Sequence, residues 1–107
     1  MLCAGFGKNW CIGWIYWGMK HLNIKVIGKV QGVMFRKRTL EKAVELGVQG
    51  FVRNEPDKSV YIEAEANEAI LEVLVAWCHV GSKRAVVEEV IAEEGDVVGL
   101  GEFRIVR

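Results

Sequence analysis

Residues 28–36 read GKVQGVMFR, and this string has the parts of a phosphate site. A strand-like run leads into it, two glycines suit a turn, and a helix-like run begins near Arg36. Successive backbone N–H groups in a tight turn form a concave nest, and a helix N-terminus adds partial positive charge. The Arg36 guanidinium offers a fixed fork of donors that suits phosphate oxygens. The string therefore predicts an anion site.

Arg36 also has a simpler interpretation, in which it pairs with Glu41 or Glu45 or stays in water. An arginine in the first turn of a helix is unfavourable for the helix dipole unless an anion lies nearby. The glycine turn directly before Arg36 favours the phosphate interpretation.

Asn54 ends a second strand-like run and is the other candidate for chemistry. Its side-chain amide can both donate and accept, so it can hold a water molecule. From spacing alone, however, a turn role is favoured, because Asn before Glu55, Pro56 and Asp57 is common in loops.

Together the two segments resemble the acylphosphatase family, whose signature is G-x-V-Q-G-V-x-F-R followed by G-[WF]-V-x-N. The matching residues are Gly28, Val30, Gln31, Gly32, Val33, Phe35 and Arg36, then Gly50, Phe51, Val52 and Asn54. The resemblance extends over about residues 20–107. It is far more specific than a glycine-containing phosphate loop alone.

The resemblance implies hydrolysis of the carboxyl–phosphate bond of acyl phosphates, without a cofactor or a metal. The implied catalytic residues are Arg36 and Asn54, and Asn54 would orient the attacking water rather than serve the turn. The implied phosphate-binding residues are Gln31, Gly32, Val33, Met34, Phe35 and Arg36. Gly32 would permit close backbone approach, and Gln31 would brace the loop.

The chain departs from the family pattern at four positions. Phe51 stands where tryptophan is common, Thr39 where tyrosine is frequent, and Ser82 where proline is usual. Lys58 replaces a hairpin glycine, which costs turn stability if that position requires a positive φ.

Composition limits the other possibilities. The formal net charge of zero gives no reason to expect nucleic acid or an anionic membrane as a partner. Cys3, Cys11 and Cys78 form no even framework, which predicts reduced thiols and a cytoplasmic protein. No His or Cys lies at metal-ligand spacing, so His21 is expected on an exposed strand face and His79 at a helix end.

The acidic residues of the predicted strands alternate with apolar ones, so we expect a solvated sheet face rather than a metal cluster. They are Glu63, Glu65, Glu88, Glu89, Glu93, Glu94 and Asp96.

Hydrophobic periodicity predicts an α+β fold of the ferredoxin-like βαββαβ type, with two helices packed on one face of an antiparallel sheet. The expected strands are residues 20–26, 48–54, 60–66, 85–92 and 103–106. One helix is expected from about Phe35 to Leu46, with Gly47 as its stop, and another between the N-cap Asn67 and Gly81. The apolar face expected on the second helix is Ile70, Val73, Leu74, Trp77 and Cys78.

Residues 1–18 differ from the rest in having three tryptophans and almost no charge. Their apolar run is far shorter than the roughly 20 residues that span a bilayer. We expect a non-essential extension followed by one domain over residues 19–107; a membrane-surface or partner-binding anchor is the alternative.

Two other functions fit such a fold, because this scaffold serves many purposes. One is a binding module for small ligands or RNA, and the other is a carbamoyl-phosphate-handling subdomain of a larger enzyme. The positions expected on the open sheet face offer one aromatic among carboxylates, a poor RNA platform. They are His21, Asn23, Lys25, Tyr61, Glu63 and Glu65. We expect an enzyme with a small acyl phosphate as its substrate, no nucleic-acid partner, no membrane span and a monomeric state.

Overall fold

The computed structural model describes residues 18–106, so the tryptophan-rich extension lies outside the described residues except for Gly18. The elements are β1 (Met19–Lys29), α2 (Phe35–Leu46), β2 (Gln49–Asn54), β3 (Val60–Asn67), α3 (Glu68–Val80), β4 (Val86–Gly95) and β5 (Arg104–Ile105). Every expected helix and strand is present, and most bounds differ from the expected ones by one to three residues.

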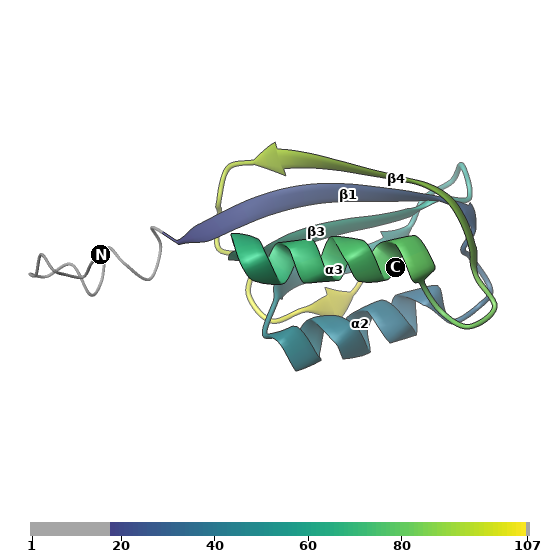
Figure 1. The fold of residues 1–107 in the computed structure, drawn as a ribbon, viewed down its shortest axis with the longest axis horizontal. Coiled ribbons are helices and arrows are strands. Elements are labelled where there is room, and N and C mark those ends of the chain that lie inside the picture. Colours follow the sequence, from purple (N-terminus) through teal and green to yellow (C-terminus); the bar gives the residue numbers. More distant parts are fainter. Residues whose placement is uncertain (1–17, 107) are drawn as a thin grey trace, which may run out of the picture.

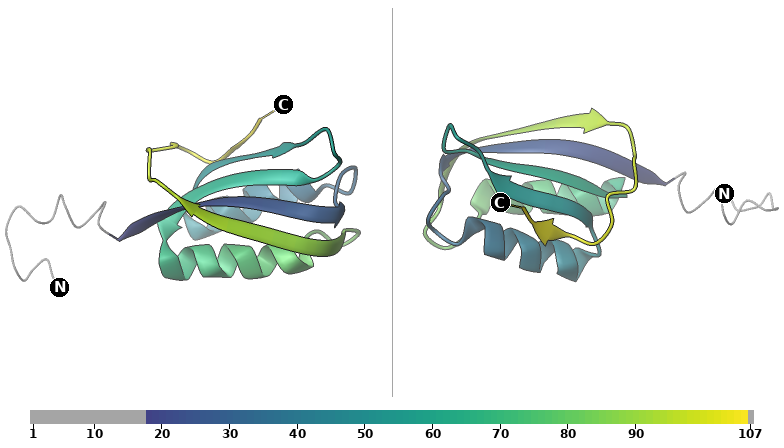
Figure 2. Two further views of the ribbon diagram at one scale, coloured as in Figure 1. Left: turned by 90° about the horizontal axis from the view of Figure 1, so that it is seen from above. Right: turned by 180° about the vertical axis from the view of Figure 1, so that it is seen from behind.

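The five strands form one sheet in the order β4-β1-β3-β2-β5, and both helices cover one of its faces (Figure 1). The first four strands pair antiparallel, as expected. The short terminal strand β5 runs parallel to β2, so the sheet is mostly antiparallel. The reason is that the segment after β4 crosses from one edge of the sheet to the other before β5 begins (Figure 2).

The core lies between the sheet and the two helices. Ile24 and Val26 of β1 pair with Ile62 and Val60 of β3, and these four side chains are fully buried. Strand residues two apart share a face, so this pairing places one apolar stripe against the helices. Phe35 at the start of α2 contacts Trp77 of α3, with ring centroids 5.4 Å apart.

The apolar face predicted for α3 is partly wrong. Leu71, Leu74 and Cys78 are its fully buried residues, whereas Val73 is 47% exposed. The cause is that apolar residues are spaced to form two overlapping stripes, and the sheet selects the stripe centred on Leu74. Asn67 caps the helix as predicted, because its side-chain oxygen accepts from the Ile70 N–H at 2.9 Å.

His21 and Glu65 are also corrections, since both were expected on an exposed strand face. They are 4% and 0% exposed. Both do face away from the helices, but the backbone of residues 98–100 covers them there. The Glu65 carboxylate accepts from the His21 ring and from the N–H groups of Val98, Gly99 and Leu100, over distances of 2.7–3.0 Å.

Candidate active site

The loop between β1 and α2, residues 30–34, is called the phosphate loop below. Two of its residues adopt left-handed conformations: Gly32 with a φ of 75° and Met34 with a φ of 63°. Glycine accepts this conformation freely, whereas it is strained for methionine. Such strain is typical of functional loops, where the surrounding structure holds a geometry that the sequence alone disfavours.

The N-terminus of α2 lies at the end of this loop without a side-chain cap and without an acidic residue in its first turn. The first N–H groups of a helix have no partner within the helix, so they need an external acceptor. Here neither a capping oxygen nor a carboxylate fills that role among residues 18–106. The helix start is therefore open to an anion.

Gln31 ties the phosphate loop to the turn between β2 and β3. Its Nε2 donates to the backbone oxygens of Glu55 and Ser59, both at 2.9 Å, which confirms the predicted bracing role. The same turn is held by Asp57, which accepts from the Ser59 N–H and from the Lys25 ammonium. The Lys25 hydrogen bond, followed by the Ser59 contacts, holds the pKa of Asp57 well below its ordinary value.

That turn includes Lys58, whose φ of 75° confirms that a lysine here adopts the positive φ that glycine accepts more readily. The turn begins directly after Asn54, the last residue of β2. Gln31 thus fixes the phosphate loop relative to the strand end that carries Asn54.

A cavity of about 460 Å³ brings the two sequence-predicted segments together. It is lined by Val30, Gly32, Met34, Phe35, Arg36, Lys37, Asn54 and Ile105. Arg36 and Asn54, far apart in the sequence, therefore share one site. Gln31 and Val33 do not line the cavity, since Gln31 binds the adjacent turn.

Arg36 does not make the ion pairs of its simpler interpretation. Glu41 pairs with Arg38 at 2.7 Å, and Glu45 pairs with Lys42 at 3.3 Å. Among the described residues, the structure shows no carboxylate bound to the Arg36 guanidinium. Its positive charge remains open to a ligand in the cavity.

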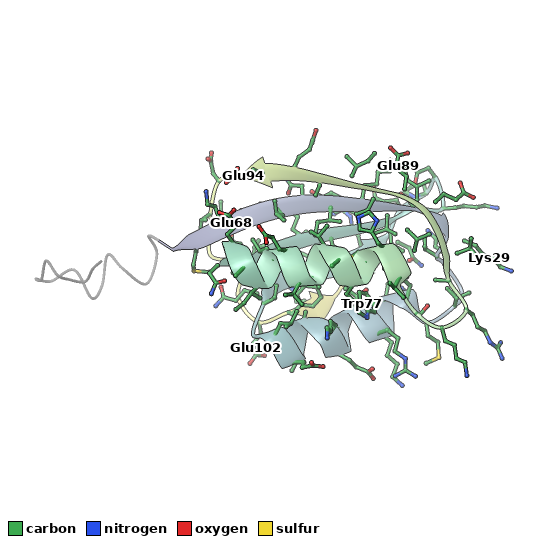
Figure 3. All side chains as sticks on the ribbon, viewed as in Figure 1. Lys29, Glu68, Trp77, Glu89, Glu94 and Glu102 are labelled. Carbon is green, nitrogen blue, oxygen red and sulfur yellow. The ribbon has the colours of Figure 1, made fainter. Side chains whose placement is uncertain are left out.

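Cations gather at the phosphate-loop end of the molecule. In the part of the chain that the structure describes, six cations of this end form no ion pair. They are Lys29, Arg36, Lys37, Lys58, Lys83 and Arg84. Figure 3 shows Lys29 at this end and Glu68, Glu94 and Glu102 at the other, while Glu89 lies toward the Lys29 end. The two charged residues that line the cavity itself, Arg36 and Lys37, are both basic, which favours an anionic ligand.

Two further depressions lie elsewhere on residues 18–106, and neither contains Asn54 or the loop between β1 and α2. A depression of about 550 Å³ beside α3 is lined by apolar side chains, by the carboxylates Glu68, Glu72 and Glu94, and by the basic residues Lys20 and His79. Within residues 18–106 no three His, Cys, Asp or Glu side chains are grouped to hold a metal ion. The Cys78 thiol is free, and burial raises its pKa to about 12.

Sequence reasoning missed Ile105 and Lys37 as site residues. Ile105 reaches the cavity only because β5 pairs with β2, and no local pattern predicts that pairing. Lys37 is an exposed residue of α2 that also lines the cavity. Arg38, the next residue of the helix, is exposed and does not line the cavity.

The geometry is matched by comparison with known proteins. The family model for acylphosphatases matches residues 22–105 of this chain. The chain belongs to the acylphosphatase family. An acylphosphatase of Marinobacter nauticus is 53% identical over 72 residues, which cover 67% of this chain and 78% of that protein. One from Trichormus variabilis is 42% identical over 86 residues, which cover 80% of this chain and 85% of that protein.

The solved structures agree with the sequence relatives. An acylphosphatase structure from Coxiella burnetii aligns with a TM-score of 0.80 at 32% identity, covering 83% of this chain and 94% of that one. This confirms the predicted ferredoxin-like α+β fold. The family also confirms the predicted activity: the chain is an enzyme that hydrolyses acyl phosphates. None of the helices in residues 18–106 has the length and apolar character needed to cross a membrane.

Proposed function

We propose that this acylphosphatase cleaves its substrate by in-line attack of a water molecule on phosphorus. The observation that carries the proposal is the single cavity shared by the open start of α2, Arg36 and Asn54. The backbone N–H groups of residues 31–35, with the Arg36 guanidinium, bind the phosphoryl oxygens. They stabilise the charge on those oxygens in the transition state, and the N–H groups are fixed before the substrate arrives.

Asn54 places the water. It lines the same cavity as the helix start, at the end of β2, and its amide can accept from water and donate to it. Holding the water opposite the leaving carboxylate converts an encounter between two molecules into a step within one complex. The Gln31 bridge fixes the phosphate loop relative to the strand end that presents this amide.

The chemistry needs neither a general acid nor a metal. A carboxylic acid has a pKa of about 4, so the carboxylate departs without a proton. A phosphoryl oxygen of the substrate accepts the proton of the attacking water. Positive charge comes from Arg36 and the loop N–H groups, in place of a cation.

We further propose a cytoplasmic monomer that does not bind nucleic acid. The open sheet face supports the absence of nucleic-acid binding, because its polar side chains bind one another. The Tyr61 hydroxyl donates to Glu63 at 2.8 Å, and burial followed by the Glu63 contact raises the Tyr61 pKa to about 12. Arg53 pairs with Glu55 at 2.7 Å.

Hydrolysis of benzoyl phosphate in ¹⁸O-labelled water, with EDTA present, tests the mechanism. Attack on phosphorus places the label in inorganic phosphate and leaves benzoate unlabelled. We expect that distribution and full activity in EDTA. Label in benzoate would mean attack on carbon, and loss of activity restored by a divalent cation would mean that a metal is required.

A further inference from the structure

The turn between α3 and β4 carries Ser82, whose buried hydroxyl contacts the phosphate loop. Ser82 in this turn is 6% exposed, and its Oγ donates to the backbone oxygen of Val33 at 2.8 Å. Val33 lies between Gly32 and Met34, the two loop residues with left-handed backbone. A single side chain from a distant segment therefore contacts the strained part of the loop.

This hydrogen bond sets the direction of a neighbouring donor. The described chain has no cis peptide bond, and in a trans peptide the C=O and N–H groups point in opposite directions. The Val33 oxygen and the Met34 N–H belong to the same peptide plane. Holding the Val33 oxygen toward Ser82 therefore turns the Met34 N–H away from the turn. Met34 lines the cavity that also contains Arg36 and Asn54.

The turn that carries Ser82 is itself firmly held. The Gly81 N–H donates to the Trp77 oxygen at 2.7 Å, and the Ala85 N–H donates to the Ser82 oxygen at 3.0 Å. A Cβ on Gly81 would lie only 2.5 Å from Cε2 of Phe35, so the turn packs closely on the first residue of α2. Ser82 therefore has a fixed position from which to orient the loop.

We propose that Ser82 is a positioning residue for the hydrolysis: it orients the Val33–Met34 peptide so that the Met34 N–H points at the phosphoryl group. Gln31 fixes the first half of the phosphate loop, and Ser82 fixes the second half from the opposite side. The inference rests on the proposed role of the loop N–H groups as phosphate donors. Preorganised donors stabilise a transition state because they need no reorientation during the reaction.

Ser82→Ala tests the inference, with inorganic phosphate as the probe ligand. We expect the inhibition constant of phosphate to rise and kcat/KM for benzoyl phosphate to fall, each by about tenfold. Ser82→Thr keeps the hydroxyl and should restore both values. In NMR titrations, phosphate should shift the Met34 amide strongly in the wild type and weakly in Ser82→Ala.

Thr39→Val is the matched control, because the buried Thr39 hydroxyl also donates to a backbone oxygen at 2.8 Å, but within α2. This variant should lose stability without changing phosphate affinity. If Ser82→Ala is too unstable to purify, Ser82→Cys replaces it, since a thiol is a weaker donor of similar size.

Unchanged phosphate affinity in a folded Ser82 variant, or equal effects in Thr39→Val, would overturn the inference. So would a Met34 amide in the wild type that does not respond to phosphate. The proposed mechanism is tested separately by Arg36: if Arg36→Lys lowers kcat/KM by about 100-fold or more while Ser82→Ala leaves kcat/KM and phosphate affinity unchanged, only the role of Ser82 is lost.

Discussion

At the scale of single residues, Arg36 differs from its neighbours in having no carboxylate bound to it among the described residues. Arg38, two positions later, pairs with Glu41 at 2.7 Å and lies on the exposed side of α2. The two arginines thus lie in the same helix turn, but the charge of Arg38 is paired with Glu41, whereas that of Arg36 can bind a ligand. This contrast provides a matched test of the phosphate site.

Arg36→Lys should lower kcat/KM by about 100-fold or more while the protein stays folded. Lysine keeps the charge but loses the planar fork that matches two phosphate oxygens. Arg38→Lys should have nearly wild-type activity. Steady-state kinetics with benzoyl phosphate, together with circular dichroism, measure both. A folded Arg36→Lys enzyme with nearly full activity would show that Arg36 does not bind the phosphoryl group.

Asn54→Ala should reduce kcat much more than it weakens competitive inhibition by inorganic phosphate. The reason is that holding the attacking water matters in the transition state, whereas bound phosphate does not depend on it. The measurement is kcat beside the inhibition constant of phosphate. An equal loss in phosphate affinity would place Asn54 in the anion site instead, and unchanged kinetics would remove it from the mechanism.

At the scale of elements, the segment between β4 and β5 decides which residues are buried on the open sheet face. Its backbone N–H groups at residues 98–100 bind the Glu65 carboxylate. The Gly101 oxygen then accepts from the Gly50 N–H at 3.1 Å, which brings the chain alongside β2. Glu65 thus anchors the crossover that delivers Ile105 to the cavity.

The pKa values of this cluster move in opposite directions. Burial acts first on Glu65 and would raise its pKa, but the hydrogen bonds from His21 and residues 98–100 outweigh it and lower the pKa below 4.5. Burial would likewise lower the pKa of His21, but Glu65, Asn23 and Glu63 outweigh it and raise the pKa above 6.5. Both ring nitrogens of His21 face oxygen acceptors, so the doubly protonated ring fits best.

The cluster should therefore stabilise the fold most between about pH 4.5 and 6.5. The Glu65 contribution is lost as pH falls through its lowered pKa, and the His21 contribution is lost as pH rises through its raised pKa. Urea unfolding at intervals from pH 3 to 9 measures this dependence. If the free energy of unfolding changes neither as the pH falls below 4.5 nor as it rises above 6.5, the proposed coupling of Glu65 and His21 is wrong.

Glu65→Gln should cost about 2 kcal/mol of stability, because an amide provides one acceptor oxygen for four donors. It should also weaken the pH dependence at both ends of the range, since the carboxylate titrates at one end and supports the protonated His21 at the other. Glu63→Gln is the control, because Glu63 is only half-buried and binds none of residues 98–100. Equal stability losses in the two variants would show that the Glu65 contacts with residues 98–100 do not stabilise the fold more than the contacts of Glu63 do.

At the scale of the whole molecule, the sheet and both helices are built from residues 19–105. β1 begins at Met19, and its buried residues Ile24 and Val26 lie well inside this range. We propose that residues 1–18 are a non-essential extension and that residues 19–107 form the acylphosphatase domain.

Deleting Met1 to Gly18 should leave kcat/KM and the melting temperature nearly unchanged. Solubility should improve, because Trp10, Trp14 and Trp17 are then no longer available for association. Thermal unfolding and benzoyl phosphate kinetics of the shortened and full-length chains measure these effects. A melting temperature lower by more than a few degrees would show that the extension stabilises the domain.

The sequence alone determined the local parts of this protein. Periodicity located the strands and helices, Asn67 and Gly47 gave two helix ends, and the loop string with Asn54 indicated the family. These features depend on neighbouring residues, whose spacing is fixed by the repeat of a strand or helix. The bracing role of Gln31 also followed from the string.

Only the tertiary structure decided which residues meet across the fold. It buried His21 and Glu65, exposed Val73, placed β5 parallel to β2, and brought Ile105 and Ser82 to the phosphate loop. Each of these outcomes depends on a contact between segments far apart in the chain. Alternation assigns a residue to one face of a sheet, but it cannot tell whether another segment covers that face.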